Sequence, residues 1–182
     1  AVLAFSAVAN QDRVGAVLFS DRIERYVPPA RGREHALRIV RDALAVVPRG
    51  RGTDLAGALR FTRGVMKRRG IVAVISDFQA EGYEKSQGVL RRRHDVVALH
   101  LLDPRETELP DAGLVALLDP ETGERRVVDL GDPDVRRRLL PGHRAQAKEA
   151  FRRTRVDALP LDTSASYERP LRQFFDARER RR

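Results

Sequence analysis

The sequence has no cysteine, no tryptophan and a single methionine among its 182 residues. Without cysteine, the chain forms neither disulfides nor a thiolate zinc site. No apolar stretch reaches the roughly 18 residues that a membrane-spanning helix needs, and no secretory signal is recognisable. We therefore expect a cytoplasmic protein, which would be membrane-associated only if helices precede residue 1.

Lysine is also scarce, because only three of the 35 basic residues are lysine and the others are arginine. The formal net charge of +9 is of the kind found in proteins that bind nucleic acid. The arginines, however, are spread along the chain and interleaved with Asp and Glu, which is typical of a solvated surface. We expect no nucleic-acid partner, and keep a basic nucleic-acid-binding domain as an alternative.

What the sequence does have is a hydrophobic fraction of 42%, enough for a folded core, in a chain whose length suits one domain. The chain starts without Met, in the apolar stretch "AVLAFSAV", which is typical of the end of a helix. We expect the natural protein to extend upstream of this stretch.

Short apolar runs bounded by polar residues predict β-strands. Residues 13–20 and 22–27 flank Asp21 and predict a hairpin, after which residues 28–32, "PPARG", are expected to break regular structure. The segments "GLVALLD" and "RRVVDLG", on either side of "PETGE", predict a second hairpin. Residues 70–76, 95–102 and 156–161 predict buried strands.

Apolar residues at helical spacing predict helices between these strands. The first spans residues 33–47 and ends before Pro48, and its predicted inward face is Leu37, Val40, Leu44 and Val47. The next starts after Thr53 or Asp54, with Leu55, Leu59, Thr62 and Met66 facing inward. Further helices are predicted near residues 83–93 and 133–153, the latter broken at Pro141–Gly142. A closing helix carries Tyr167, Leu171, Phe174 and Phe175.

Alternating strands and helices predict an α/β fold with an open, mostly parallel, doubly wound sheet. In such sheets, binding sites form beyond the carboxyl ends of the strands. Thr53 lies at a glycine-rich helix start, in "GRGTDLAGAL", and Asp77 follows the strand "IVAVIS". Both residues are therefore candidates for one functional rim.

These stretches, with "DRVGAVLFSD", "YVPPARGREHALRIV" and the closing "YERPLRQFFDARERRR", resemble bacterial domain-of-unknown-function family fifty-eight. The resemblance covers nearly the whole chain and implies a von Willebrand factor type A-like domain over residues 1–182. In that fold, the first strand and its Asp-x-Ser-x-Ser metal motif would lie upstream of Ala1. An added hairpin would complete the domain.

The resemblance also implies a metal-ion-dependent adhesion site, in which Thr53 and Asp77 are ligands of magnesium or manganese. With one ligand loop upstream, we expect these 182 residues alone not to hold the metal tightly. "DTSAS", residues 162–166, has the spelling of the metal motif but follows a late strand. We interpret it as a loop in which Ser166 caps the closing helix.

Simpler roles exist for each candidate. Thr53 or Asp77 would serve as a helix cap without any metal, and Asp54 is expected to stabilise a helix start. Asp103 and Glu106 are expected on the same rim, forming salt bridges with nearby arginines. The four histidines show no metal-ligand spacing, and His100 is expected to pack within its strand.

The resemblance implies a non-enzymatic, metal-dependent protein-interaction domain. Its expected partners are a MoxR-type AAA+ ATPase and a protein client, in chaperone-like assembly or maturation, with a membrane tether upstream in some relatives. A metal-dependent phosphoester hydrolase is the alternative, which would need further carboxylates or a histidine near Thr53 and Asp77. Asp103 is the only such candidate that the sequence offers.

Overall fold

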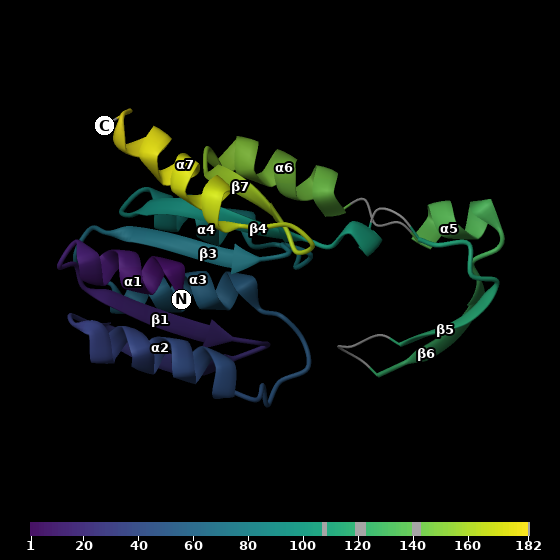
Figure 1. The fold of residues 1–182 in the computed structure, drawn as a ribbon, viewed down its shortest axis with the longest axis horizontal. Helices are drawn as coiled ribbons and strands as arrows, with labels where there is room; N and C mark the ends of the chain where they lie inside the picture. The colour runs from purple at the N-terminus through teal and green to yellow at the C-terminus, as the bar shows by residue number, and fades with distance from the viewer. Residues whose placement is uncertain (107–108, 119–122, 140–142, 182) are drawn as a thin grey trace. The chain divides into compact units, whose positions relative to one another are not determined.

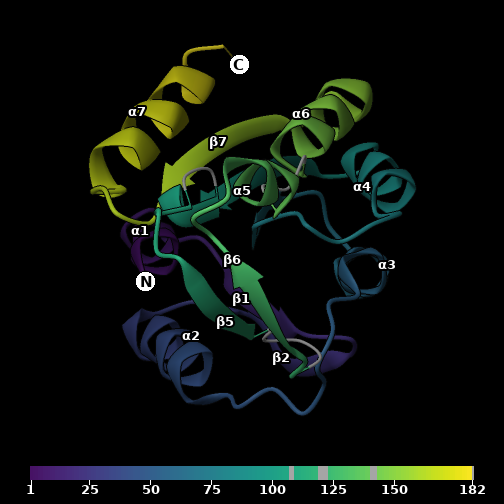
Figure 2. The ribbon, with the colours of Figure 1, turned by 90° about the vertical axis from the view of Figure 1, so that its right-hand side faces the viewer.

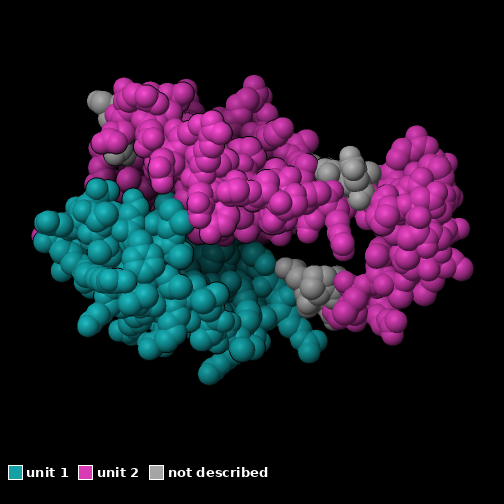
Figure 3. Space-filling model, viewed as in Figure 1, with its two compact units in different colours: residues 1–65 teal, residues 66–182 magenta. Residues whose placement is uncertain are grey.

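The computed structural model describes residues 1–106, 109–118, 123–139 and 143–181. It divides into two compact units, residues 1–65 and 66–182, which Figure 3 shows in different colours. Each unit is described by itself. None of the described helices combines the length and apolar character that crossing a bilayer requires.

The first unit contains two strands and three helices (Figure 1). The helices are α1 (Val2–Ala9), α2 (Arg33–Ala45) and α3 (Leu55–Val65), and the strands are β1 (Val14–Phe19) and β2 (Ile23–Ala30). β1 and β2 form the predicted antiparallel hairpin, with Val17 opposite Tyr26. Its core combines Val27 of β2 with Ala36 of α2 and Leu55 of α3, all at most 1% exposed.

The prediction that residues 28–32 break regular structure is wrong for its first three residues, because β2 continues through Pro28 and Pro29 to Ala30. Proline lacks an N–H and is tolerated in a strand that pairs on one side only, and the register shifts at this end of the hairpin. Gly15 lets the backbones of β1 and β2 come close together at this end of the hairpin, since a Cβ at position 15 would lie 2.8 Å from the Val27 carbonyl oxygen.

The predicted inward face of α2 is also wrong. Leu37 is 48% exposed, Leu44 is 84% exposed and Val47, beyond the helix, is 82% exposed. The helix instead buries Ala36, Ile39 and Asp42. Asp42 on this side accepts a hydrogen bond of 3.0 Å from the Arg25 Nε of β2, so the buried side of the helix includes a charged residue that a search for apolar periodicity passes over.

The second unit contains a parallel three-stranded sheet in the order β3–β4–β7. Its strands are β3 (Ile71–Ser76), β4 (Asp95–Leu102) and β7 (Asp157–Asp162). Its helices are α4 (Glu84–Arg91), the 3₁₀ turn η1 (Pro104–Glu106), α5 (Pro133–Leu139), α6 (His143–Thr154) and α7 (Glu168–Glu179). A second antiparallel hairpin, β5 (Leu114–Leu118) with β6 (Arg125–Asp129), confirms that prediction.

Helices cover both faces of the β3–β4–β7 sheet, as expected for a doubly wound arrangement. Arg178 of α7 pairs with Asp95 and Asp157, which share one face of the sheet. His100 points to the opposite face and contacts Phe151 of α6. Figure 2 shows α7 on one side of β7, with α4 and α6 on the other.

The structure is thus a mixed α/β fold, but it has three separate sheets among its described residues instead of one open sheet. β4 has a strand on each side and both its faces covered, so it is the centre of the second unit. β3 is an edge strand of its sheet, and its Ile71 and Ile75 are 53% and 55% exposed. The prediction that residues 70–76 form a buried strand is therefore wrong for Ile71 and Ile75, although Val74 is 7% exposed.

Candidate functional site

The two predicted metal ligands lie in different units. Thr53 lies in the loop between α2 and α3 of the first unit, immediately before Asp54 and the start of α3. Asp77 directly follows β3 in the second unit, at the carboxyl end of the parallel sheet. Both residues are exposed.

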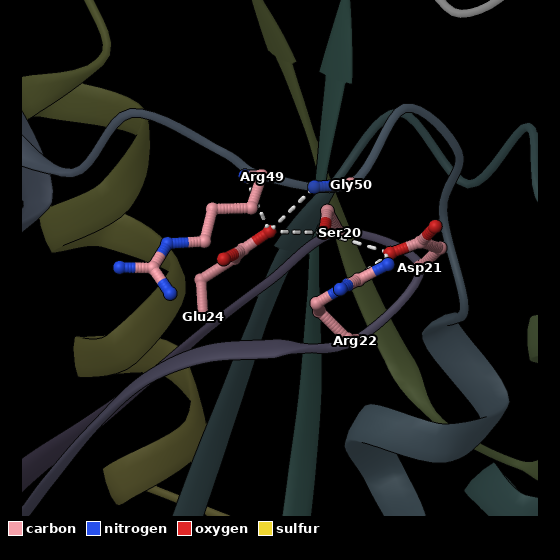
Figure 4. A network of polar contacts seen from close by, with 6 residues as sticks. All are labelled: Ser20, Asp21, Arg22, Glu24, Arg49 and Gly50. Carbon is pink, nitrogen blue, oxygen red and sulfur yellow. Dashed lines mark hydrogen bonds and ion pairs between the residues drawn. The ribbon is translucent and has the colours of Figure 1, made fainter.

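A hydrogen-bond network at the turn of the β1–β2 hairpin fixes the loop that carries Thr53 (Figure 4). The Oε1 atom of Glu24 accepts three hydrogen bonds, from the Ser20 hydroxyl at 2.5 Å and from the backbone N–H groups of Arg49 and Gly50 at 2.8 and 3.0 Å. The Asp54 N–H also donates to the Ser20 carbonyl oxygen at 2.8 Å. The loop is therefore tied to the hairpin at both ends.

Gly50 is required by this arrangement. A Cβ at position 50 would overlap the carboxylate of Asp21 and the hydroxyl of Ser20, so no larger residue fits without displacing the network. Gly50 of "GRGTD" thus allows the backbone of this loop to lie close to the turn of the β1–β2 hairpin.

Both carboxylates of the network are held in the ionised form. The hydrogen bond from Ser20, with help from the Gly50 N–H, lowers the pKa of Glu24 below its usual value. The hydrogen bond from the Arg22 guanidinium, 2.9 Å from Asp21 Oδ1, likewise lowers the pKa of Asp21. A hydrogen bond to the charged form of an acid favours that form, which explains both directions.

Asp54 caps α3, as predicted. Its Oδ1 atom accepts the N–H of Gly57 at 2.7 Å, three residues further on, and α3 begins at the next residue, Leu55. A Cβ at Gly57 would overlap the Asp54 carboxylate, so the glycine makes room for the cap. With the cap at Asp54, Thr53 stands outside the helix, on the loop that Glu24 fixes.

In the second unit, Asp77 lies in a tight turn that its own side chain helps to form. Its Oδ1 atom accepts the Gln79 N–H at 3.2 Å, and the Ser76 hydroxyl accepts the Phe78 N–H at 3.0 Å. Phe78 has a φ of 56°, in the left-handed region that is unfavourable for a residue with a side chain. Such backbone strain persists only where the surroundings enforce it, and it is enriched at functional sites.

An aromatic cluster holds this strained turn. Phe78 is only 3% exposed and its ring lies 4.8 to 5.6 Å from those of Tyr83, His100 and Phe151. Burial raises the pKa of Tyr83 to about 12. Burial also lowers the pKa of His100, against the opposing effect of its hydrogen bond to the backbone of Asp77. The neutral His100 side chain thus supports the Asp77 turn through its hydrogen bond and its contact with Phe78. The prediction that His100 packs within the sheet is confirmed.

An Asp ends, or directly follows, each of the three parallel strands, and the three side chains act alike. Asp77, Asp103 and Asp162 accept the backbone N–H of the residue two positions later, at 3.2, 2.9 and 2.8 Å. All three are exposed. Because the strands are parallel, these carboxylates share the carboxyl edge of the sheet.

The other rim predictions have mixed outcomes. Ser166 does not cap α7, which begins at Glu168 after Tyr167 without a side-chain capping bond. Asp162 instead organises "DTSAS", since its Oδ1 accepts both the N–H and the hydroxyl of Ser164, which lowers the Asp162 pKa. Asp77 is not a helix cap, because α4 starts only at Glu84. The side chain of Glu106 and the helix break at 140–142 lie outside the described residues.

Thr53 and Asp77 each carry a side-chain oxygen of a kind that can bind a divalent metal ion. Hydroxyl and carboxylate oxygens, as at Thr53 and Asp77, are the ligands that magnesium and manganese prefer. Two protein oxygens are few for an octahedral ion, and the described residues contain no group of three His, Asp or Glu side chains that could hold a metal ion. Water, other residues of the protein or a partner's carboxylate would have to fill the remaining positions.

Sequence reasoning missed the anchors of both loops, which are Glu24 with Ser20 in the first unit and His100 in the second. The signal for Ser20 was present as a polar "SD" directly after an apolar strand, the same pattern that pointed to Asp77. No local signal marked Glu24 or His100, since each contacts a segment distant in the sequence.

Comparison with protein families identifies the chain. The family described as "Protein of unknown function DUF58" matches residues 1–149. The chain belongs to this family. That membership confirms the resemblance to family fifty-eight, while the family description itself assigns no function.

Curated relatives are mycobacterial. The chain is 31% identical, over 99% of its length, to Uncharacterized protein Rv1480 of Mycobacterium tuberculosis and to Uncharacterized protein Mb1516 of Mycobacterium bovis, and it spans 58% of the length of each. It is 34% identical, over 84% of its length, to Uncharacterized protein MAV169 of Mycobacterium avium, of which it covers 94%. No solved structure matches the chain.

Proposed function

We propose that this DUF58 domain is a von Willebrand factor A-like protein-interaction module whose recognition surface is built around a magnesium or manganese ion. Thr53 and Asp77 would each give the ion one oxygen. The ion would keep residual positive charge, because a hydroxyl and a single carboxylate neutralise little of it. An acidic side chain of a partner would then complete the coordination.

The observation that carries this proposal is the exposed Asp77 carboxylate on its strained, aromatic-supported turn. Strained backbone is enriched at functional sites, and at Phe78 three aromatic rings hold it in place. The fixed loop at Gly50 gives the same kind of support to Thr53. The fixed loop and the supported turn favour the proposal, because a preformed ligand loop would lose less conformational entropy when an ion binds.

The proposed partner is an AAA+ ATPase of the MoxR type, acting with this domain on a protein client. This part of the proposal rests on the family resemblance. It predicts that ATPase binding requires the metal ion, because the ion supplies the charge that the acidic partner group recognises.

The test uses the full-length protein and magnesium chloride. Magnesium at 100 times its dissociation constant should stabilise the folded protein by about 2.7 kcal/mol. Thr53→Ala and Asp77→Asn should each abolish that increment while keeping the fold. Asp77→Asn is the sharper variant, since its amide oxygen still accepts the Gln79 N–H but carries no charge.

The matched control is Asp111→Ala, an exposed acid that pairs with Arg136 at 3.7 Å and belongs to neither of the loops that carry Thr53 and Asp77. It should retain the full magnesium increment. If Asp77→Asn keeps the increment, or if the wild-type protein shows none, the metal proposal is wrong. If the metal proposal holds, EDTA should abolish binding of a purified MoxR-type ATPase. Hydrolysis of p-nitrophenyl phosphate that is lost in the Asp77 variant would instead favour the alternative function, a phosphoester hydrolase.

A further inference from the structure

The β5–β6 hairpin exposes an apolar face. Directly opposite residues of an antiparallel pair point to the same side of the ladder. The face is made of three such pairs, and we call these six residues the hairpin face: Leu114 with Asp129, Ala116 with Val127, and Leu118 with Arg125.

Large apolar side chains of the hairpin face are open to solvent. Leu114 is 75% exposed, Leu118 is 62% exposed and Val127 is 72% exposed. The opposite side of the hairpin is better covered, since Val115 and Val128 are half-buried. Among the described elements, β5 and β6 pack extensively only against each other. A two-stranded hairpin with one uncovered apolar side is marginal on its own in water.

The hairpin is nevertheless held at its base. The Leu130 N–H donates to the Gly113 carbonyl oxygen at 2.7 Å, and Leu130 is 3% exposed. The Arg136 guanidinium of α5 donates to the Leu130 carbonyl oxygen and lies 3.7 Å from the carboxylate of Asp111. These contacts join α5 to the segments that flank the hairpin and hold the two strand ends together.

The charges on the hairpin face are arranged at opposite ends. Arg125 lies beside Leu118 at one end and Asp129 beside Leu114 at the other, with Ala116 and Val127 between them. Both charged residues are exposed. The face is therefore apolar in its middle, positive at one end and negative at the other.

We propose that the occupant of the hairpin face is the same face of a second copy of this chain. A twofold axis lying between the two sheets and perpendicular to the strands would place β5 on β5 and β6 on β6, with the strands antiparallel. Leu114 then meets Leu118 of the other copy, Ala116 meets Ala116 and Val127 meets Val127. Each Arg125 lies over an Asp129, so both ends match by charge.

Other occupants fit less well. An anionic membrane or a nucleic acid would be attracted by Arg125 and repelled by Asp129, because the face carries one charge of each sign. A twofold self-contact needs that combination, since every residue of an isologous interface meets the surface of an identical copy. The six residues are fewer than the roughly 20 to 30 per side of a stable interface, so the pairing is weak and depends on concentration.

The first test exchanges the charges of Arg125 and Asp129 and measures dimerisation of the full chain by sedimentation. Concentrations should reach about 1 mM, because a dimer with a binding free energy of about −4 kcal/mol has a dissociation constant near that value. Arg125→Asp alone, or Asp129→Arg alone, sets like charges against each other at both ends and should weaken dimerisation at least about tenfold. The double variant restores opposite charges and should recover the wild-type dissociation constant.

Both substitutions lie on exposed residues of a peripheral hairpin, so unfolding is not expected to obscure the result. The proposal is overturned if the wild-type chain stays monomeric over the whole range. It is also overturned if the double variant dimerises no better than the two single ones, because the charge matching would then play no part.

A second test uses the absence of cysteine in these 182 residues. Ala116→Cys puts one thiol at the proposed twofold axis, and a short bismaleimide should link two chains through it. The matched control is Arg126→Cys, which is also at an exposed position but lies on the other side of the hairpin, opposite Leu117. Both variants are first compared by their rate of reaction with a monofunctional maleimide, and equal yields of linked dimer from thiols of equal reactivity would contradict the face-to-face arrangement.

Discussion

β4 and β5 contain the same tripeptide, Val-Ala-Leu, in opposite environments. In β4, Val97 and Ala98 are 0% exposed and Leu99 is 3% exposed. In β5, Leu117 of the same tripeptide is 36% exposed and its neighbour Leu118 is 62% exposed. The local sequence makes both segments strands, but it does not decide whether they become core.

The difference comes from neighbours. β4 lies between β3 and β7, with α7 over one face and α6 over the other. β5 has β6 on one edge only. A substitution in one copy of the tripeptide therefore tests packing in a covered strand, while the same substitution in the other copy tests a strand of an exposed hairpin.

The largest effect should come from Leu99→Ala. Removing a buried leucine side chain leaves a cavity, and we expect a loss of about 2–5 kcal/mol in the free energy of unfolding. The same change at Leu117 should cost about 0.5 kcal/mol, since surface substitutions seldom cost more. Urea unfolding followed by circular dichroism measures both. Similar costs at the two positions would mean that β5 is buried in solution.

A smaller effect should separate the arginines of the two regions. Arg178 of α7 is 14% exposed and pairs with Asp95, which is 21% exposed, and with Asp157. Arg178→Ala leaves both carboxylates without this partner and should cost roughly 1–3 kcal/mol, below the value for a fully buried pair. Arg126 and Glu124 of the hairpin are largely exposed, so Arg126→Ala should cost about 0.5 kcal/mol or less.

In the same urea experiment, the two arginine variants should differ in midpoint but not in slope. An Arg178→Ala midpoint equal to that of Arg126→Ala would show that α7 is not clamped to the starts of β4 and β7 by this ion pair.

The smallest effect is a dependence on acid that only the sheet region should show. Burial lowers the pKa values of His94 and His100 below 6.5, whereas β5 and β6 contain no histidine. The folded protein then binds fewer protons than the unfolded chain as the pH falls below 6.5. Stability should thus be complete above that pH and decline from about pH 6.5 toward pH 5.

Urea midpoints across this range check the acid effect. His100→Gln and His94→Gln should each make the decline shallower, whatever they do to stability at about pH 8. The lowered pKa values of Asp21, Glu24 and Asp162 keep these acids ionised throughout. A midpoint that stays constant between about pH 8 and pH 5 would contradict the assignment of two buried neutral histidines.

Much of the candidate site follows from local sequence. Asp77 after an apolar strand and Asp54 before a helix were predictable, because strand ends and helix caps have local signatures. The supports of these residues were not. Glu24 reaches Gly50 across 26 positions, and His100 reaches the backbone of Asp77 from the neighbouring strand. Whether Thr53 and Asp77 share a metal ion stays a prediction.

By itself, the sequence determined the order and kind of the elements, both hairpins and the cap of α3, because periodicity and turn chemistry act over a few residues. Only the tertiary structure decided which apolar residues are buried. On α2, Ala36, Ile39 and Asp42 are buried, whereas Leu37 and Leu44 are exposed. In β4 and β5, equal stretches of Val-Ala-Leu differ because burial depends on which strands and helices lie alongside, and no short stretch of sequence contains that information.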